Sequence, residues 1–436
     1  MARAKKWGIS AGTVFMLVFS LCTLLAAGVV YLRISGDAAY IRLDSALLSE
    51  PLREMAGVPV SDAGESPQPS LPAPASATDA PMQSPTASPT PTATPRQPVT
   101  LLAAGQIALG SQLRESGLDA AGAYRYDDIF SPVASTLSGA DVSLVTLRTG
   151  LGEENFGNYL APSALARSLS AAGVDLANLG TDRLLDGGVA GMSATVAALT
   201  GAQITGVGAL REPTLVEAGG LCLGFVSYVD SLSSAGLAAA SEAEIAAAVR
   251  MLDVQTVQSD IAQIREQGAD VVVVLVYWGS RSDTAPSDAT RQTADALARS
   301  GADVILGVGP TSVHALERKS VVSADGYVRE VFIAYSLGNF LIDDSRETRD
   351  ITGLMLSLTF EWDEANQCAR ISDAWYMPTW IMRWRDEAGA YRFRVVPAGA
   401  SSRPENMTES IYQNMQGAYE SLVNRLGEDA ARPVAQ

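Results

Sequence analysis

The sequence holds few of the side chains that usually perform acid–base catalysis. Its single histidine is His314, which falls where we expect the first turn of a helix and therefore a surface or capping role. Ser336 precedes the pair Gly338-Asn339, but a serine nucleophile needs an activating base, and no histidine is near it in the sequence. The glycine of this pair is more simply explained by a tight bend after a strand. These residues give no sign of a serine-type catalytic site.

Phosphate and nucleic-acid chemistry are also disfavoured. Gly105 and Gly110 bracket a short glycine-containing loop, but the Lys-Ser/Thr pair of a phosphate-binding loop does not follow. The net charge is -17, whereas binding to phosphate backbones needs clustered lysine and arginine. Three cysteines are too few for a disulfide framework, and only Cys222 and Cys368 lie outside the apolar N-terminal run. No pattern indicates that these two pair.

The N-terminus is predicted to anchor the chain in a membrane. Basic residues occur within residues 1–6, and residues 7–32 then carry no charge, which is enough for a helix to span about 30 Å of hydrocarbon. A cleaved signal peptide is the alternative, but this run is longer than a typical signal and no clean Ala-x-Ala site follows. The basic residues predict that residues 1–6 are cytoplasmic and that the chain after residue 32 is extracytoplasmic.

Two further segments are expected before the globular domain. Residues 33–65 are mixed in character and are interpreted as a membrane-proximal segment. Residues 66–98 consist mainly of proline, serine, threonine and alanine, which cannot bury enough apolar surface to repay chain ordering. We therefore predict a disordered, semi-rigid linker there.

From residue 99 the pattern becomes that of an α/β domain. Short apolar runs that indicate buried strands occupy 99–104, 142–147, 174–179, 204–207, 221–229, 271–278 and 304–308. Helical spacing occurs over 163–172, 189–199, 242–267 and 289–300. This interleaving predicts βαβ units and a largely parallel or mixed sheet. Consecutive antiparallel strands are expected over 328–335, 353–362 and 368–375.

Three tryptophans near the end of this region, Trp375, Trp380 and Trp384, allow two interpretations. They could form an aromatic face that binds a polymer, or they could pack in the core or at a domain edge. The sequence favours packing, because large aromatic side chains are most often buried.

Several segments between residues 99 and 385 resemble, in order, the CapA or poly-gamma-glutamate capsule synthesis family (PGA_cap). AYSLGNFLID at 334–343 retains the family's Tyr-Ser-Leu-Gly-Asn-Phe, and MPTWI at 377–381 resembles its closing Pro-Thr-Trp. GQIALG at 105–110, LANLGTDRLLDGG at 176–188 and VLVYWG at 274–279 stand where the family has metal-binding motifs. The resemblance implies a metallophosphoesterase-like α/β/β/α sandwich over 99–385, followed by a C-terminal extension over 386–436.

The metal-binding motifs themselves are changed. Where the family has aspartate, glutamate and a strand-end histidine, this chain has Gln106, Arg148 and Tyr277, and its Asn-His pair is replaced by Asp182-Arg183. Thr311 lies within the altered final histidine cluster. Arginine is a permanent cation that repels a metal ion. We therefore predict no catalytic metal pair and no cofactor, as in a pseudoenzyme.

The altered positions are expected at the carboxyl ends of strands, where open α/β sheets bind ligands. The predicted pocket comprises Gln106, Arg148, Asp182, Arg183, Asp186, Tyr277, Thr311 and Asn339. In one interpretation, the two arginines bind an anion of an envelope polymer. In the other, they pair with Asp182, Asp186 or another acid and fill the vacated site.

The N-terminal apolar run and its flanking charges predict an extracytoplasmic, single-pass cell-membrane protein. The resemblance implies that it acts with capsule or poly-gamma-glutamate-type polymers in synthesis or export. Its expected partners are the membrane, an anionic envelope polymer and capsule-synthesis membrane proteins, and not nucleic acid. Two alternatives stay open. One is a metal-independent hydrolase or transferase that uses Asp182, Asp186 and Tyr277, and the other is a non-catalytic scaffold for membrane partners.

Overall fold

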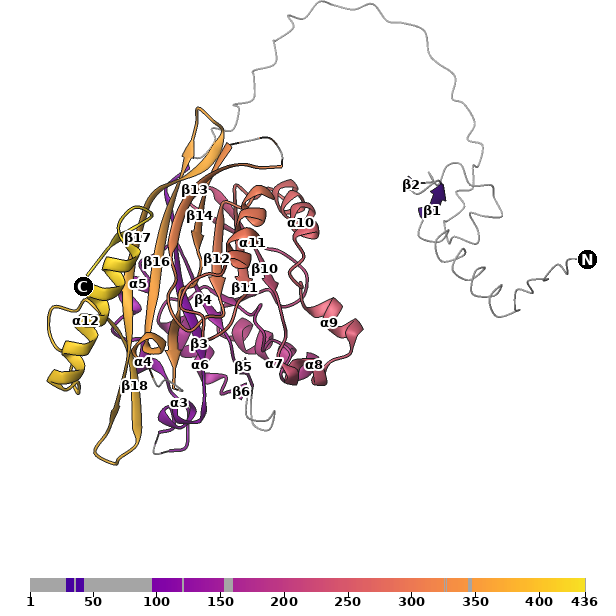
Figure 1. Ribbon diagram of the computed structural model, residues 1–436. Helices are drawn as coiled ribbons and strands as arrows, with labels where there is room; N and C mark the ends of the chain where they lie inside the picture. Colours follow the sequence, from indigo (N-terminus) through magenta and orange to yellow (C-terminus); the bar gives the residue numbers. More distant parts are fainter. Residues whose placement is uncertain are drawn as a thin grey trace, which may run out of the picture. The chain divides into compact units, whose positions relative to one another are not determined.

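The computed structural model describes residues 29–34, 37–42, 96–119, 121–152, 160–324, 326, 328–343 and 347–435, in two compact units, Met1–Ser88 and Pro89–Gln436. In the first unit, strands β1 (Val29–Ile34) and β2 (Asp37–Arg42) form an antiparallel pair. The second unit contains the α/β domain and is drawn in Figure 1.

The predicted membrane helix lies outside the described residues except at its end. Residues 29–32, at the end of that predicted helix, belong to strand β1. Residues 66–95 of the predicted linker also lie outside the described part. Within the described residues, no helix has the length and apolar character that a membrane span requires.

One sheet of the second unit has nine strands. Along its main path the order is β18-β17-β16-β3-β4-β7-β8, with β15 beside β3 and β19 beside β17. Strands β3, β4, β7 and β8 run parallel, and β16, β17 and β18 add an antiparallel meander. Its strands are β3 (Val99–Ala108), β4 (Val142–Leu147), β7 (Leu176–Asn178), β8 (Thr205–Val207), β15 (Asn339–Ile342), β16 (Thr352–Asp363), β17 (Cys368–Arg385), β18 (Tyr391–Pro397) and β19 (Arg432–Pro433).

The other sheet has six strands in the order β13-β14-β12-β11-β10-β9. Strands β10, β11, β12 and β14 are parallel, whereas β9 and β13 are antiparallel edge strands. Its strands are β9 (Thr214–Ala218), β10 (Leu221–Val229), β11 (Val271–Tyr277), β12 (Val304–Val308), β13 (Leu316–Val322) and β14 (Val328–Ala334). A short parallel pair, β5 (Gly150–Leu151) and β6 (Leu160–Ala161), lies outside both sheets.

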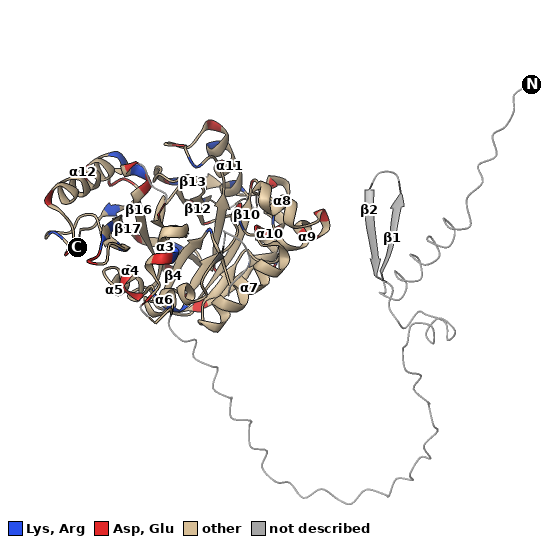
Figure 2. Ribbon diagram, turned by 90° about the horizontal axis from the view of Figure 1, so that it is seen from below, with Lys and Arg blue, Asp and Glu red and all other residues tan. Residues whose placement is uncertain are grey.

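The helices are short and mostly follow parallel strands. Their bounds are α3 (Ser111–Ser116), α4 (Asp127–Phe130), α5 (Ala134–Leu137), α6 (Ala164–Ala171), α7 (Gly188–Gly201), α8 (Ser234–Ala239), α9 (Glu242–Ala248), α10 (Val254–Glu266), α11 (Asp288–Arg299), the 3₁₀-helix η3 (Thr348–Ile351) and α12 (Glu409–Leu426). Figure 2 shows that α7 carries no charged residue, whereas α12 carries both signs.

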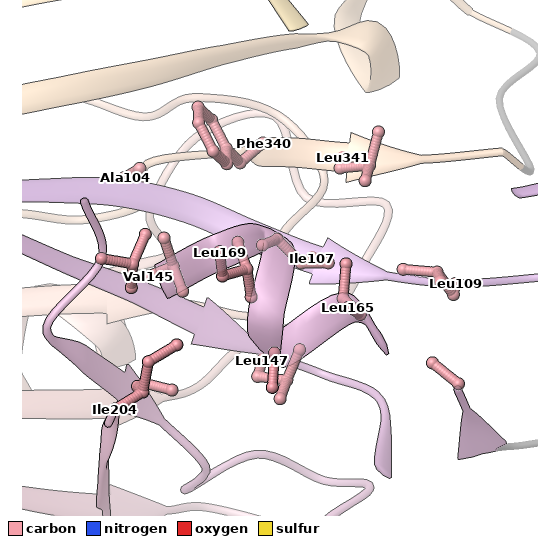
Figure 3. Close-up of a cluster of buried hydrophobic side chains, with 14 of the residues drawn as sticks. Ala104, Ile107, Leu109, Val145, Leu147, Leu165, Leu169, Ile204, Phe340 and Leu341 are labelled. Carbon is pink, nitrogen blue, oxygen red and sulfur yellow. The ribbon is translucent and has the colours of Figure 1, made fainter. Parts of the chain in front are cut away.

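Alternating side chains divide the interior into layers. On β3, Leu101 and Ala103 pack against residues of the six-stranded sheet, whereas Leu102 and Ala104 face the helices. Figure 3 shows Ala104 and Ile107 of β3 in the helix-side cluster, which includes Leu165 and Leu169 of α6. On the outer face of the six-stranded sheet, α10 and α11 cover β11 and β12. The sequence of layers is helix, sheet, sheet, helix, as the expected α/β/β/α sandwich requires.

Two local expectations were wrong, and a third was right only in part. The single helical stretch over 242–267 is two helices, because residues around Met251 bridge to Val229 at the end of β10 and Asp253 caps α10. Where a helix was expected to begin at His314, an irregular segment leads into strand β13. The expected antiparallel pairing is confirmed for β16 and β17, but β14 lies in the other sheet, where it pairs in parallel with β12.

The chain after residue 385 belongs to the same compact unit as the rest of the domain. Strand β18 pairs with β17, and β19 pairs with the middle of β17 at Trp375. Helix α12 packs Met415 against Trp380 and Met382 of β17. The predicted C-terminal extension therefore completes the nine-stranded sheet and covers part of it.

Candidate functional site

The eight predicted site residues lie at or after the carboxyl ends of strands, apart from Asn339 at the start of β15. Arg148 follows β4, Tyr277 ends β11, and Thr311 comes soon after β12. Asp182, Arg183 and Asp186 occupy the segment between β7 and α7. Parallel strands bring their carboxyl ends to one edge of a sheet, which explains this placement. The side chains form two hydrogen-bonded groups.

The first group is built on an ion pair. Arg148 donates from Nε to Oδ1 of Asp182 over 2.8 Å and from Nη2 to Oδ2 over 2.7 Å. The two side chains are only 5% and 16% exposed. This bidentate geometry is the strongest arrangement for a guanidinium and a carboxylate. Both oxygens of Asp182 are thus engaged by a cation that belongs to the protein.

Tyr277 lies beside this pair. The guanidinium carbon of Arg148 is 5.9 Å from the centre of the Tyr277 ring. Burial raises the pKa of the Tyr277 hydroxyl to about 12, so the phenol is neutral at physiological pH. Burial by itself would lower the pKa of Arg148, but the hydrogen bond to Asp182 and the interactions with Tyr277 outweigh it and raise that pKa. Arg148 is therefore held as a cation.

A second acid lies next to the pair. Arg183 Nε is 3.9 Å from Oδ2 of Asp186, whose side chain is only 5% exposed. Ser233, which caps α8, donates its hydroxyl to Asp186, and its backbone N–H donates to the carbonyl of Asp182. Burial raises the pKa of Asp186 above its ordinary value. The cap of α8 therefore ties the segment that carries Asp182 and Asp186 to the end of the neighbouring sheet.

The second group surrounds Gln106. Its Nε2 donates to Oδ1 of Asn339 over 2.9 Å and lies 3.3 and 3.4 Å from the carbonyl oxygens of Gly309 and Pro310. Asn339 donates to the carbonyl of Asp350 over 2.7 Å. Thr311 donates its hydroxyl to the Asp350 carboxylate over 2.8 Å. The amide nitrogen of Gln106 thus faces three oxygen atoms, while its buried Oε1 has no hydrogen-bond partner among the described residues.

Two glycines allow this close packing. Gly338 has a φ of 65°, a left-handed conformation that favours glycine. A side chain on Gly105 would place its Cβ 2.5 Å from the carbonyl oxygen of Gly338. The prediction of a permissive bend at Gly338-Asn339 is confirmed, and the bend places Asn339 beside Gln106.

His314 corrects the sequence interpretation. It is only 2% exposed and precedes β13 in an irregular segment rather than capping a helix. Its Nε2 donates to the carbonyl of Asp283 over 3.0 Å. Burial lowers the pKa of the imidazole below its ordinary value. A neutral, hydrogen-bonded histidine in a core is a structural residue. Its partner Asp283 is remote in the sequence, so no local pattern indicated its burial.

The donor set does not fit a pair of divalent metals. Such a site needs carboxylates and neutral imidazoles that point at the ions. Here the carboxylate of Asp182 is engaged by Arg148, and an amide nitrogen of Gln106 faces the oxygens of the second group. Over the described ranges, no cluster of three or more histidine, cysteine or acidic residues has the geometry to hold a metal ion.

Sequence reasoning missed several residues of the site. Asp350 in η3 joins Thr311 and Asn339, although nothing in its local sequence distinguishes it.

The three tryptophans form no single aromatic face. Trp375 packs against the helix-side cluster, whereas Trp380 and Trp384 pack with α12. Alternation along β17 explains the division, because odd and even positions face opposite sides. Cys222 is buried and Cys368 exposed, and both are free thiols.

Comparisons with known proteins place these observations in a family context. The model of the bacterial capsule synthesis protein PGA_cap matches residues 100–344. Capsule biosynthesis protein CapA of Bacillus anthracis is 27% identical over 261 residues, which are 56% of this chain and 60% of that protein. PGA biosynthesis protein CapA of Bacillus subtilis (strain 168) is 42% identical over 83 residues, 19% of this chain and 20% of that protein. The matches therefore span less than two thirds of either relative.

Solved structures show only remote similarity. The calcineurin-like phosphoesterase YfkN from Bacillus subtilis is 13% identical, with 75% of this chain and 99% of that chain covered and a TM-score of 0.36. A phosphatase from Mycoplasma pneumoniae is 10% identical, with 65% and 94% covered and a TM-score of 0.36. At this level the two structures carry no conclusion about activity.

Proposed function

The chain belongs to the bacterial capsule synthesis protein family PGA_cap, and from this premise we propose that it acts in the synthesis or export of an envelope polymer without metal-dependent catalysis. In this proposal the apolar N-terminal run anchors the chain in the cell membrane, and the α/β domain is extracytoplasmic. The family membership supports the capsule role. The altered site supports the absence of metal chemistry.

The observation that carries the proposal is the bidentate pair of Arg148 and Asp182. An arginine is charged at every physiological pH, so it occupies the place of a cation permanently. A metal ion brought to Asp182 would have to displace a buried guanidinium at hydrogen-bond distance and then lie beside its charge. Gln106 is a second substitute, because its amide nitrogen already donates toward three oxygens.

Metal content and phosphoesterase activity test the proposal directly. The full-length protein, purified in detergent and incubated with manganese, is expected to retain no stoichiometric metal after desalting and to leave p-nitrophenyl phosphate unhydrolysed. The variant Arg148→Ala frees the Asp182 carboxylate, so it tests whether removal of the guanidinium alone restores metal binding. Two manganese ions per chain together with turnover in the unmodified protein would reject the proposal.

A metal-independent hydrolase or transferase is the second candidate. Burial raises the pKa of Asp186, which favours a carboxyl group that can hold a proton and act as a general acid. Ser233 and Arg183 fix its position. In this case activity on an envelope substrate would persist in excess chelator and would be lost in Asp186→Asn, whereas the leading proposal expects neither result.

A further inference from the structure

A separate cleft lies between helices α3 and α4 and the strands β17 and β18. Its cavity volume is about 470 Å³, and its walls include Leu118, Asp127, Asp128, Trp384, Arg392 and Arg394. This volume is typical of small-molecule sites, which usually occupy about 300 to 1,000 Å³. None of the eight strand-end residues lines it. We call it the hairpin cleft, because β17 and β18 form a hairpin beside it.

Arg394 is the unusual residue of the hairpin cleft. Its Nε is buried and has no hydrogen-bond partner in the described part of the chain, and none of the ion pairs found among the described residues includes it. Its guanidinium carbon lies 5.3 Å from the ring centre of Trp384, which holds the group without neutralising its charge. Arg392 differs, since it donates to Asp386 over 2.8 Å and to the carbonyl of Ser116 over 2.6 Å.

The other residues that line the hairpin cleft indicate which chemical groups a bound ligand carries besides its anionic group. Leu118 is 42% exposed, and Trp384 is half-buried, so both offer apolar surface to a ligand. Asp127 accepts a hydrogen bond from Ser168 through Oδ1, and Asp128 is exposed. Carboxylates only accept hydrogen bonds, so these aspartates call for donors such as hydroxyl groups.

We propose that the hairpin cleft binds an acidic sugar unit, with its carboxylate on Arg394, its hydroxyl groups toward Asp127 and Asp128, and its apolar face against Trp384. A guanidinium and a carboxylate form charge-assisted hydrogen bonds, and sugars commonly place apolar ring faces on aromatic side chains. A chain with a carboxylate on every unit and no hydroxyl groups fits less well, because the aspartates would repel it. This inference goes beyond the proposed function and does not rest on Arg148 or Asp182.

Calorimetric titration of the full-length protein in detergent tests this assignment. The probe is a tetrasaccharide of alternating glucuronate and N-acetylglucosamine, and the matched neutral probe is chitotetraose, which has no carboxylate. We expect the acidic tetrasaccharide to bind at least about tenfold more tightly than chitotetraose, as one charged hydrogen bond predicts. A γ-linked glutamate oligomer is expected to bind more weakly than the acidic sugar.

Two variants make the result specific to the hairpin cleft. Arg394→Gln should weaken binding of the acidic tetrasaccharide at least about tenfold and leave chitotetraose unaffected. Arg383→Gln is the control, because Arg383 also lies over an aromatic ring, Tyr391, but does not line the cleft. Asp128 is exposed, so Asp128→Asn should leave folding unchanged. This variant gives a second readout and should bind the acidic tetrasaccharide several-fold more weakly. No binding, equal binding by Arg394→Gln, or tighter binding of the glutamate oligomer would each overturn the assignment.

Discussion

Arg148 and Asp182 form a bidentate ion pair, with hydrogen bonds of 2.8 and 2.7 Å between side chains that are 5% and 16% exposed. The two residues are brought together by the neighbouring parallel strands β4 and β7. Because both charges are largely withdrawn from water, each depends on the other for its stability. The pair therefore makes a quantitative prediction about folding.

Arg148→Ala should lower the free energy of unfolding by about 3 to 5 kcal/mol, since it leaves the Asp182 carboxylate buried without its partner. The double variant Arg148→Met with Asp182→Leu should lose less than the single variant, because no charge remains unpaired. Urea denaturation measures the free energy of unfolding of the unmodified protein, the single variant and the double variant. Arg370→Ala is the control, since its pair with Glu361 is 57% and 40% exposed and should contribute less than about 1 kcal/mol. An Arg148 variant as stable as the Arg370 variant would contradict the prediction.

Gln106→Glu should destabilise the protein more at pH 8 than at pH 5. An ionised glutamate would direct an oxygen at Asn339 Oδ1 and at two carbonyl oxygens, none of which can donate to it. Burial and these acceptors raise the pKa of such a carboxyl group. The variant protein therefore keeps its stability while the carboxyl group is protonated and loses stability as the pH rises through that pKa. Urea midpoints at the two pH values measure the effect. Gln106→Leu, which cannot ionise, should show no comparable dependence on pH.

The imidazole of His314 should titrate below its ordinary pKa of about 6.5, because burial disfavours its charged form. The unfolded chain then binds a proton more readily than the folded protein does. Stability from this group is complete above about pH 6.5 and is lost as the pH falls from there toward the folded pKa. Because His314 is the chain's one histidine, a single imidazole resonance reports the titration by NMR. His314→Gln should flatten this part of the stability profile, and a resonance that titrates above 6.5 would refute the prediction.

Cys368 offers a test of the proposed topology. It is exposed on β17, whereas Cys222 is buried with a pKa raised to about 11 by burial, which makes it unreactive. A maleimide that cannot cross membranes should therefore label intact cells through Cys368 if the domain is extracytoplasmic. Labelling should be lost in Cys368→Ser and unchanged in Cys22→Ser. Labelling that requires cell lysis would place the domain on the other side of the membrane.

Local patterns in the sequence predicted much of the fold. Apolar runs such as 221–229 and 271–278 mark buried strands because both faces of a central parallel strand are covered. The retained segment around Gly338-Asn339 and the altered motifs that occur in the family's order predicted the family, which the comparison confirmed. The substitutions at Gln106, Arg148 and Tyr277 were also predicted from the sequence, because the residue type at a motif position is known without a structure.

Tertiary structure decided which partners these residues have. Periodicity records that a face is buried, but not which sheet receives it, so β14 and β16 could not be assigned to different sheets. Likewise, the sequence offered Arg148 several acids, and only the spacing of β4 and β7 selects Asp182. Tertiary structure likewise decides that His314 is buried and that Arg394 has no ion-pair partner among the described residues. Hydrogen bonds and ion pairs act over a few ångströms, and distances between residues remote in sequence are set by the packing of whole strands and helices.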